Sequence, residues 1–277
     1  MSDAIGLIAG QGHYPIEAAA SIRKNGSRVV AVAFHDLSDP QIEAAADEGH
    51  RIYLGQLATL FDILQKAGCQ QLLLAGKVPK TFLYRDMSAL RPDAKTFELI
   101  GKLGDLKDDS VLGAFAHALE AEGFSLLEQC ATCPDLVAET GVLGGVPVDD
   151  EQRADIRFGW PIVKRLGESD VGQTVVVRKK AVMALEAIEG TDAAIRRGGE
   201  LGGPGGCVIK AAKPSQDPRF DVPAVGLETL LSAAEVGIRT IAVEAGATLL
   251  IQRDAFLQEA DRHDVAVVGV DEGGEFE

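Results

Sequence analysis

The sequence predicts an α/β protein made of a Rossmann-like N-terminal domain with a parallel sheet and a distinct, mixed α/β C-terminal domain. Two observations carry this prediction. In the first half, short runs rich in Val, Ile and Leu alternate with helix-length segments, which is typical of a parallel sheet covered by helices on both faces. After Cys130 the turn-forming residues gather and the strand-like runs lie closer together. A chain of 277 residues is long enough for two hydrophobic cores.

The N-terminal domain is expected to cover residues 1–131, with strands where β-branched and aliphatic residues concentrate. The expected strands are 5–9, 28–34, 50–54, 71–75 and 124–129. The expected helices between them are 14–24, 40–48, 57–66 and 110–122. Strands that alternate with helices of this length form a doubly wound layout.

A linker is expected over 132–150, because Pro134, Pro147 and the glycines of Gly141–Gly145 interrupt the periodicity. The C-terminal domain is expected to cover 151–270, and its helices are 150–166, 182–188, 192–197, 227–236 and 254–262. Its expected strands are 174–178, 207–212, 240–243, 248–251 and 265–268, the last ones pairing with one another. The acidic tail, 271–277, is expected to be disordered.

Composition excludes several classes of function. The net charge of −15 repels nucleic acid, which binds proteins through positive surface. The apolar runs have strand length and fall far short of a membrane span, and the first residues lack the basic region of a secretory signal. Four cysteines in a chain of this size do not indicate a disulfide scaffold, so we expect a cytoplasmic protein. An anionic substrate then requires a locally basic pocket.

Two glycine turns are expected at one edge of the N-terminal sheet. Gly10-Gln11-Gly12 follows the first strand and opens a helix, where backbone N–H groups favour an anion. Gly76-Lys77-Val78-Pro79-Lys80 follows the fourth strand, so Lys77 and Lys80 are expected to face the same crevice as Gln11. The alternative is a tight turn and a solvated loop. Pro15 replaces the third glycine of the dinucleotide fingerprint, yet Asp36 stands where a ribose-binding acid would, so an NAD-dependent oxidoreductase stays open.

The strongest candidate for chemistry is the stretch from Lys213 to Pro223, which holds three prolines and a mixture of cations and carboxylates. Lys213 and Arg219 are suited to bind phosphate, while Asp217 and Asp221 are suited to hold Mg²⁺ or activate water. The glycine-rich run from Gly198 to Gly206 before it is expected to be a loop that offers N–H groups to an anion. The alternative is a surface loop with internal ion pairs.

A second acidic group precedes the glycine run. Glu186, Glu189 and Asp192 are expected between two helices, where Thr191 or Asp192 is suited to cap the second helix. Brought near Asp217 and Asp221, these carboxylates would complete a metal site. The Cys130–Cys133 pair lacks further ligands, so neither a zinc site nor a redox role is expected.

Four stretches together resemble the LpxI-type UDP-2,3-diacylglucosamine pyrophosphatases of lipid A biosynthesis. They are Ile8–Gly12 with Pro15, Leu74–Val78, Ala184–Asp192 and, most specifically, Lys213–Gly226, and the similarity extends to about Val270. The resemblance implies hydrolysis of UDP-2,3-diacylglucosamine to UMP and 2,3-diacylglucosamine 1-phosphate (lipid X), with Mg²⁺ as activator. It also implies a substrate enclosed between two domains, and a protein that touches the cytoplasmic face of the inner membrane transiently.

The candidate site residues fall into three roles, of which Asp221 and Asp217 take the catalytic one. The candidate substrate-binding residues are Gly10, Gln11, Gly12, Gly76, Lys77, Val78, Thr191, Lys213 and Arg219. The candidate metal ligands are Asp217, Asp221, Glu186, Glu189 and Asp192. A non-catalytic carrier of the nucleotide or the lipid remains the alternative from another class.

Overall fold

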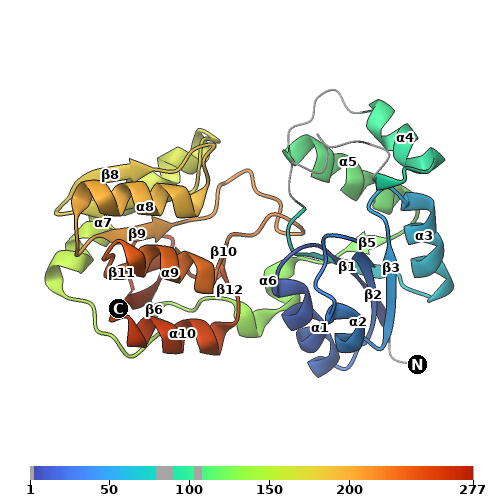
Figure 1. The fold of residues 1–277 in the computed structure, drawn as a ribbon, viewed down its shortest axis with the longest axis horizontal. Coiled ribbons are helices and arrows are strands. Elements are labelled where there is room, and N and C mark those ends of the chain that lie inside the picture. The colour runs from blue at the N-terminus through green and yellow to red at the C-terminus, as the bar shows by residue number, and fades with distance from the viewer. Residues whose placement is uncertain (1–2, 79–89, 103–107, 277) are drawn as a thin grey trace. The chain divides into compact units, whose positions relative to one another are not determined.

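The computed structural model describes residues 3–78, 90–102 and 108–276 (Figure 1). The chain divides into two compact units, Met1–Pro134 and Asp135–Glu277, and each is considered by itself. The expected linker over 132–150 is only partly a connection. Strand β6 (Gly141–Val142) pairs antiparallel with β13 (Ala266–Val270), so part of this stretch belongs to the second sheet.

The first unit contains a five-stranded parallel sheet in the order β3-β2-β1-β4-β5. Its strands are β1 (Ala4–Ala9), β2 (Arg28–Phe34), β3 (Glu48–Ile52), β4 (Gln71–Ala75) and β5 (Ser125–Leu126). Its helices are α1 (Tyr14–Lys24), α2 (Ile42–Ala45), α3 (Leu57–Lys66), α4 (Ala94–Lys102), α5 (Asp108–Ala121) and α6 (Gln129–Thr132). The expected parallel sheet is confirmed, and the strand order reverses between β1 and β4.

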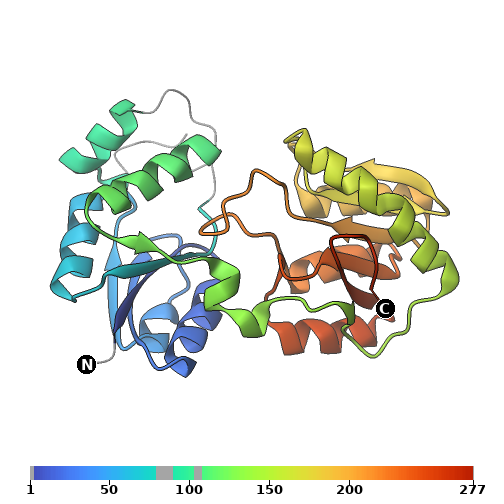
Figure 2. The same ribbon diagram turned by 180° about the vertical axis from the view of Figure 1, so that it is seen from behind.

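The sheet of the first unit is buried on both faces. Leu60 and Leu64 of α3 and Leu119 of α5 pack with Val30 and Val32 on one face, forming a single apolar cluster. Helices α1 and α2 contact the sheet and each other away from α3 and α5 (Figure 2). Helix α4 is absent from the sequence-based prediction, and α2 and β5 are shorter than predicted.

The second unit is built on a six-stranded mixed sheet in the order β6-β13-β11-β9-β7-β8. Its further strands are β7 (Thr174–Arg178), β8 (Ala181–Leu185), β9 (Cys207–Lys210) and β11 (Thr240–Glu244), while β10 (Ala224–Val225) and β12 (Leu249–Leu250) form a separate pair. Its helices are α7 (Asp150–Glu168), α8 (Thr191–Gly202), α9 (Leu227–Glu235) and α10 (Arg253–Arg262). The central strands β9, β11 and β13 are parallel, whereas β6, β7 and β8 pair antiparallel with their neighbours.

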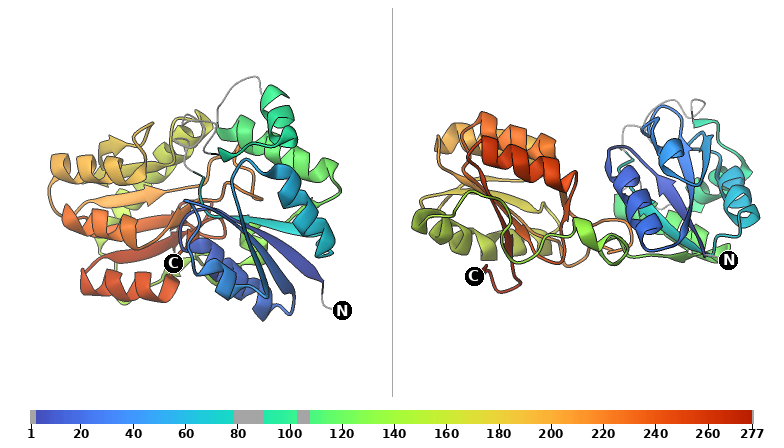
Figure 3. Two further views of the ribbon diagram at one scale, coloured as in Figure 1. Left: turned by 45° about the vertical axis from the view of Figure 1, so that its right-hand side comes forward. Right: turned by 90° about the horizontal axis from the view of Figure 1, so that it is seen from below.

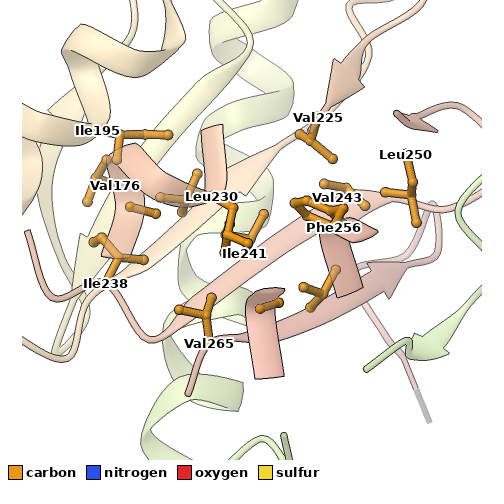
Figure 4. Packing of buried hydrophobic residues seen from close by; sticks show 14 of the residues in the cluster. Val176, Ile195, Val225, Leu230, Ile238, Ile241, Val243, Leu250, Phe256 and Val265 are labelled. Carbon is orange, nitrogen blue, oxygen red and sulfur yellow. The ribbon is translucent and has the colours of Figure 1, made fainter. Parts of the chain in front are cut away.

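Helices cover both faces of this second sheet (Figure 3). On one face Val176, Ile195, Leu230, Ile241 and Phe256 pack together, which joins α8, α9 and α10 to the sheet (Figure 4). On the other face Ile156, Trp160 and Val163 of α7 pack against the opposite side of the strands. The expected mixed α/β architecture is therefore confirmed, although β11 and β12, predicted to pair, lie in different sheets.

The helix predicted over 182–188 is wrong, because residues 181–185 form strand β8. Lys179 and Lys180 adopt φ of 50° and 56° and make the turn that returns the chain beside β7. The buried carboxylate of Asp155 holds this turn by accepting hydrogen bonds from the backbone N of Lys179 at 2.9 Å and of Lys180 at 2.6 Å. A left-handed turn held by a distant side chain leaves little trace in local periodicity.

The glycine run is not a loop over its whole length, because α8 continues to Gly202. A Cβ atom at Gly198 would lie 2.5 Å from the Val176 side chain, and one at Gly199 would lie 2.2 Å from that of Val236. These glycines therefore allow α8 to approach its neighbours closely. They do not serve as an anion-binding loop.

The tail from 271 is ordered as far as residue 276, which contradicts the predicted disorder. Trp160 Nε1 donates to the carbonyl of Glu272 at 3.1 Å, and Arg157 pairs with Glu275 at 2.7 Å. Phe276 is only 3% exposed and belongs to the core on the α7 side. Burial of this aromatic ring, together with the two polar contacts, anchors the acidic segment.

Candidate active site

One group of candidate residues, in the first unit, lies where β1 and β4 end, at the reversal of strand order. Gly10 N donates to the carbonyl of Ala75 at 2.7 Å, and Gln11 N donates to the carbonyl of Lys77 at 2.7 Å. Lys77 N donates in return to the carbonyl of Gln11 at 3.0 Å, so the two turns form an antiparallel bridge. The prediction that Gln11 and Lys77 share one edge of the sheet is confirmed. Ligands of open parallel sheets bind at such a reversal.

Two glycines make this approach of the turns sterically allowed. A Cβ at Gly10 would lie 2.7 Å from the carbonyl oxygen of Lys77, and one at Gly76, whose φ is +87°, would lie 2.7 Å from that of Gln11. Gly12 also has positive φ, +99°, but a Cβ there would meet nothing within 4 Å. The structural need for glycine is therefore strongest at Gly10 and Gly76, while Gly12 faces open space.

The edge formed by these turns suits an anionic group. Helix α1 begins directly after it with Pro15 in the first turn, and the side chain of its N-cap residue, His13, makes no capping hydrogen bond. Such N–H groups carry a partial positive charge. Gln11, Lys77 and Val78 are exposed beside them. The described residues of the first unit therefore offer Lys77 and a helix N-terminus at the same edge of the sheet, while Lys80 lies outside the described residues.

The candidate residues of the second unit include the segment that follows β9, which we call the 211–223 segment. Asp217 holds a tight turn in it, since its Oδ1 accepts from Arg219 N at 3.0 Å and from Nε at 2.9 Å. Arg219 Nη2 pairs with Asp217 Oδ2 at 2.6 Å. The hydrogen bond from the Arg219 side chain lowers the pKa of Asp217 below its ordinary value. A carboxylate held in this way is a weak proton acceptor.

Asp221 closes the same turn by its backbone, with Asp221 N donating to the carbonyl of Asp217 at 2.9 Å. Its side chain is half-buried. Lys213, at the other end, lies 2.9 Å from Asp170 through its Nζ, and its backbone N donates to Gln216 Oε1 at 2.8 Å. The predicted cations thus form ion pairs within or beside the segment.

The acidic residues before α8 are separated by their contacts. Glu186 is buried and accepts from Thr191 Oγ1 at 2.9 Å, whereas Glu189 pairs with Arg197 at 2.5 Å. Asp192 lies in the first turn of α8, and its buried Oδ1 has no hydrogen-bond partner among the described residues. Across the described residues no three His, Cys, Asp or Glu side chains come together as a metal site. The five predicted carboxylate ligands therefore do not come together as one metal site. The acidic group was predicted between two helices, but it lies between strand β8 and helix α8.

Sequence reasoning missed two buried charges at the carboxyl ends of adjacent strands. Lys210, the last residue of β9, donates through Nζ to Thr191 Oγ1 and to the carbonyl of Ala224, both at 3.2 Å. Glu244, the last residue of β11, pairs with Lys164 at 2.9 Å and accepts from Ala212 N at 2.8 Å. The available signal was a single charged residue that ends an otherwise apolar strand.

The Cys130 and Cys133 thiols are not joined in a disulfide. Tyr14 OH donates to Cys133 Sγ at 3.8 Å, and burial raises the pKa of Cys133 to about 11. A thiol with this pKa stays protonated at neutral pH and is a poor nucleophile. Separately, none of the described helices has the length and apolar character needed to cross a membrane.

Comparison with known proteins gives one relative with extensive sequence similarity. The UDP-2,3-diacylglucosamine pyrophosphatase LpxI of Caulobacter vibrioides is 33% identical over 282 residues, which cover 96% of this chain and 97% of the relative.

Two solved structures found by comparison are far more distant. The biotin carboxylase domain of the Hydrogenobacter thermophilus 2-oxoglutarate carboxylase is 13% identical with a TM-score of 0.26, covering 64% of this chain and 35% of that one. The glycinamide-RNase-transformylase T of Mycobacterium tuberculosis is 11% identical with a TM-score of 0.25, covering 67% and 44%. Scores this low carry no argument about fold or function.

Family comparison covers nearly the whole chain in two pieces. The LpxI N-terminal domain matches residues 4–136, and the LpxI C-terminal domain matches residues 139–268. With the similarity to the Caulobacter vibrioides protein, these matches show that the chain belongs to the LpxI family.

Proposed function

We propose that this protein hydrolyses the pyrophosphate bond of UDP-2,3-diacylglucosamine, releasing UMP and 2,3-diacylglucosamine 1-phosphate. The observation that carries the proposal is the similarity to a protein named UDP-2,3-diacylglucosamine pyrophosphatase, at 33% identity over nearly the full length of both chains. The NAD-dependent oxidoreductase is disfavoured by the same observation. In addition, Pro15 stands where the third glycine of a dinucleotide fingerprint is needed.

The reaction needs positive charge for the pyrophosphate and a base for the attacking water. Lys77 and the N-terminus of α1 supply positive charge at the edge of the first sheet. Asp221 is our proposed base, because its backbone N is fixed by the carbonyl of Asp217 at 2.9 Å and its side chain is half-buried in a stiff segment. In our proposal Asp221 accepts a proton from water while the water oxygen bonds to phosphorus. The bond from phosphorus to the bridging oxygen then breaks, and the second phosphate leaves.

We also propose that Mg²⁺ activates the reaction. The described side chains do not form a ready cage of three or more acidic ligands. Mg²⁺ is commonly bound by one or two carboxylates together with substrate phosphates, and when bound it neutralises charge on the phosphoryl oxygens. The roles of Lys77 and Asp221 are derived without it.

A cytoplasmic location with brief contact at the inner membrane surface completes the proposal. It follows from the substrate, whose two acyl chains hold it in a lipid leaflet while its nucleotide extends into water. The strongly acidic chain, with a net charge of −15, favours a short contact over stable adsorption to anionic lipid.

The direct test measures UMP release from UDP-2,3-diacylglucosamine in detergent micelles, first with Mg²⁺, then with EDTA, then with Mg²⁺ restored. We expect turnover that EDTA abolishes and Mg²⁺ restores. Binding of the substrate without release of UMP would instead identify a carrier. In a thermal-shift comparison UMP should stabilise the protein and NADH should not, since only a ligand of the folded state raises the melting temperature. The opposite result would favour an oxidoreductase.

A further inference from the structure

The 211–223 segment, which carries Asp221, is attached to the second sheet by two buried charged side chains. Glu244 holds its beginning, because Oε2 accepts from Ala212 N at 2.8 Å. Lys210 holds its end, because Nζ donates to the carbonyl of Ala224 at 3.2 Å. Strands β9 and β11 are direct neighbours, with Lys210 opposite Val243, so both attachments arise from one place at the carboxyl edge of the sheet.

Both charges are nearly removed from water, with Lys210 only 5% exposed and Glu244 only 8% exposed. Burying a charged group carries a large desolvation penalty unless hydrogen bonds compensate for it. Glu244 is compensated by Lys164, whose Nζ lies 2.9 Å from Oε1. Lys210 is compensated by Thr191 Oγ1 at 3.2 Å, and the same hydroxyl donates to Glu186 at 2.9 Å. Apolar residues would fill these positions with less penalty, so stability alone does not account for the charges.

Further contacts make the segment stiff between its two ends. Ala211 N donates to the carbonyl of Gln173 at 3.1 Å, and Gln216 Nε2 donates to Gln173 Oε1 at 3.1 Å. Asp221 N is held by the carbonyl of Asp217 at 2.9 Å. A chain restrained at its start, its middle and its end keeps the Asp221 backbone at a defined place relative to the sheet.

We propose that Glu244 and Lys210 are positioning residues, which fix the two ends of the 211–223 segment and thereby set where the Asp221 carboxylate stands. The inference rests on the proposed function for its catalytic consequence, but the attachment of the segment is a property of the free protein. Because a displacement of about 1 Å can lower a rate by on the order of 10²-fold, loss of either attachment should act on turnover.

The test compares Glu244→Leu, Glu244→Gln and Lys210→Met with the matched control Asp155→Ala. Asp155 is also a buried carboxylate that holds backbone N–H groups, but it does so at the turn between β7 and β8. This turn lies at the end of the sheet where β9 begins, away from Lys210 at its carboxyl end. Hydrogen–deuterium exchange of the ligand-free proteins is measured across 211–223, alongside kcat and KM for UMP release. If these side chains only stabilised the fold, all variants would melt at a lower temperature, and exchange would not increase specifically within 211–223.

We expect Glu244→Leu and Lys210→Met to speed exchange within 211–223 and to lower kcat by about tenfold or more, with KM within about threefold. Glu244→Gln keeps an acceptor for Ala212 N and should retain kcat within about threefold, whereas Asp155→Ala should leave both kcat and this exchange unchanged. Unchanged exchange in the first two variants, or an equal loss of kcat in the control, would overturn the proposal. If the wild-type protein releases no UMP, the proposed function fails, while the exchange measurement still decides whether the two side chains hold the segment.

Discussion

Replacement of Asp221 by Asn tests the assignment of the catalytic base most directly. The amide has nearly the shape of the carboxylate but cannot take a proton from water. The hydrogen bond from Asp221 N to the carbonyl of Asp217, 2.9 Å long, uses only backbone atoms and survives the change. We therefore expect a folded protein that binds substrate normally.

The expected loss follows from what a general base contributes, about 10²- to 10⁴-fold in rate. At 1.36 kcal/mol for each factor of ten, Asp221→Asn should raise the activation barrier by about 2.7 kcal/mol or more. The matched control is Asp217→Asn, four residues earlier in the same turn. Its pair with Arg219 is about 30% exposed, so its loss should lower the free energy of unfolding by only about 0.5–1 kcal/mol and kcat by a few-fold.

The assay is initial-rate release of UMP at saturating substrate and Mg²⁺, with substrate binding measured separately by calorimetry. Asp221→Asn should bind UDP-2,3-diacylglucosamine about as tightly as the wild type while turning it over at least about 100-fold more slowly. A kcat within a few-fold of wild type for Asp221→Asn, or a larger loss for Asp217→Asn, would refute the reasoning and move the base to Asp217.

Three further predictions concern the remaining site residues and the cysteines. Lys77→Ala should weaken transition-state binding by about 1.5–3 kcal/mol, measured as kcat/KM, and no change would show that the first-unit edge does not face the pyrophosphate. Cys130→Ser with Cys133→Ser should keep turnover within about threefold, and elemental analysis should find no stoichiometric zinc in the wild type; zinc near one per chain that is lost in the double variant would contradict this. Because Arg219 lowers the folded-state pKa of Asp217, the pair contributes stability above the unfolded pKa of about 3.9 and loses it as pH falls through the lower folded value. The difference in unfolding free energy between wild type and Asp217→Asn should accordingly be constant from about pH 7 to 5 and shrink toward about pH 3; a constant difference down to pH 3 would exclude the pairing.

Local patterns in the sequence were sufficient wherever an element depends on its own residues. Strands β1, β2, β4 and β7 and helices α1 and α3 lie within one residue of their predicted bounds, because runs of β-branched residues and amphipathic repeats are local properties. The proximity of Gln11 and Lys77 was predictable as well. It follows from the rule that parallel strands end at one edge of their sheet.

Where contacts with distant residues determine the conformation of a segment, the local sequence did not predict it. Residues 182–185 became a strand because Asp155, far away in the chain, holds the turn before them. Gly198 and Gly199 continue a helix because Val176 and Val236 lie against them, although glycine alone favours a loop. Phe276 orders an acidic tail by reaching the core against α7. In each case a contact made in the folded state outweighed the local preference.

For the candidate site residues, too, local sequence and tertiary contacts determined different things. The sequence by itself determined which side chains are available for chemistry, since a lysine, an arginine and two aspartates in a proline-rich segment are visible without a structure. Only the tertiary structure decided their roles. Arg219 pairs with Asp217, and the five predicted metal ligands do not come together. Lys210 and Glu244 hold the two ends of the 211–223 segment through hydrogen bonds to its backbone and to the residue that follows it. The physical reason is that hydrogen bonds and ion pairs depend on distances of about 3 Å between atoms, and residues remote in the chain reach those distances only once the sheet has formed.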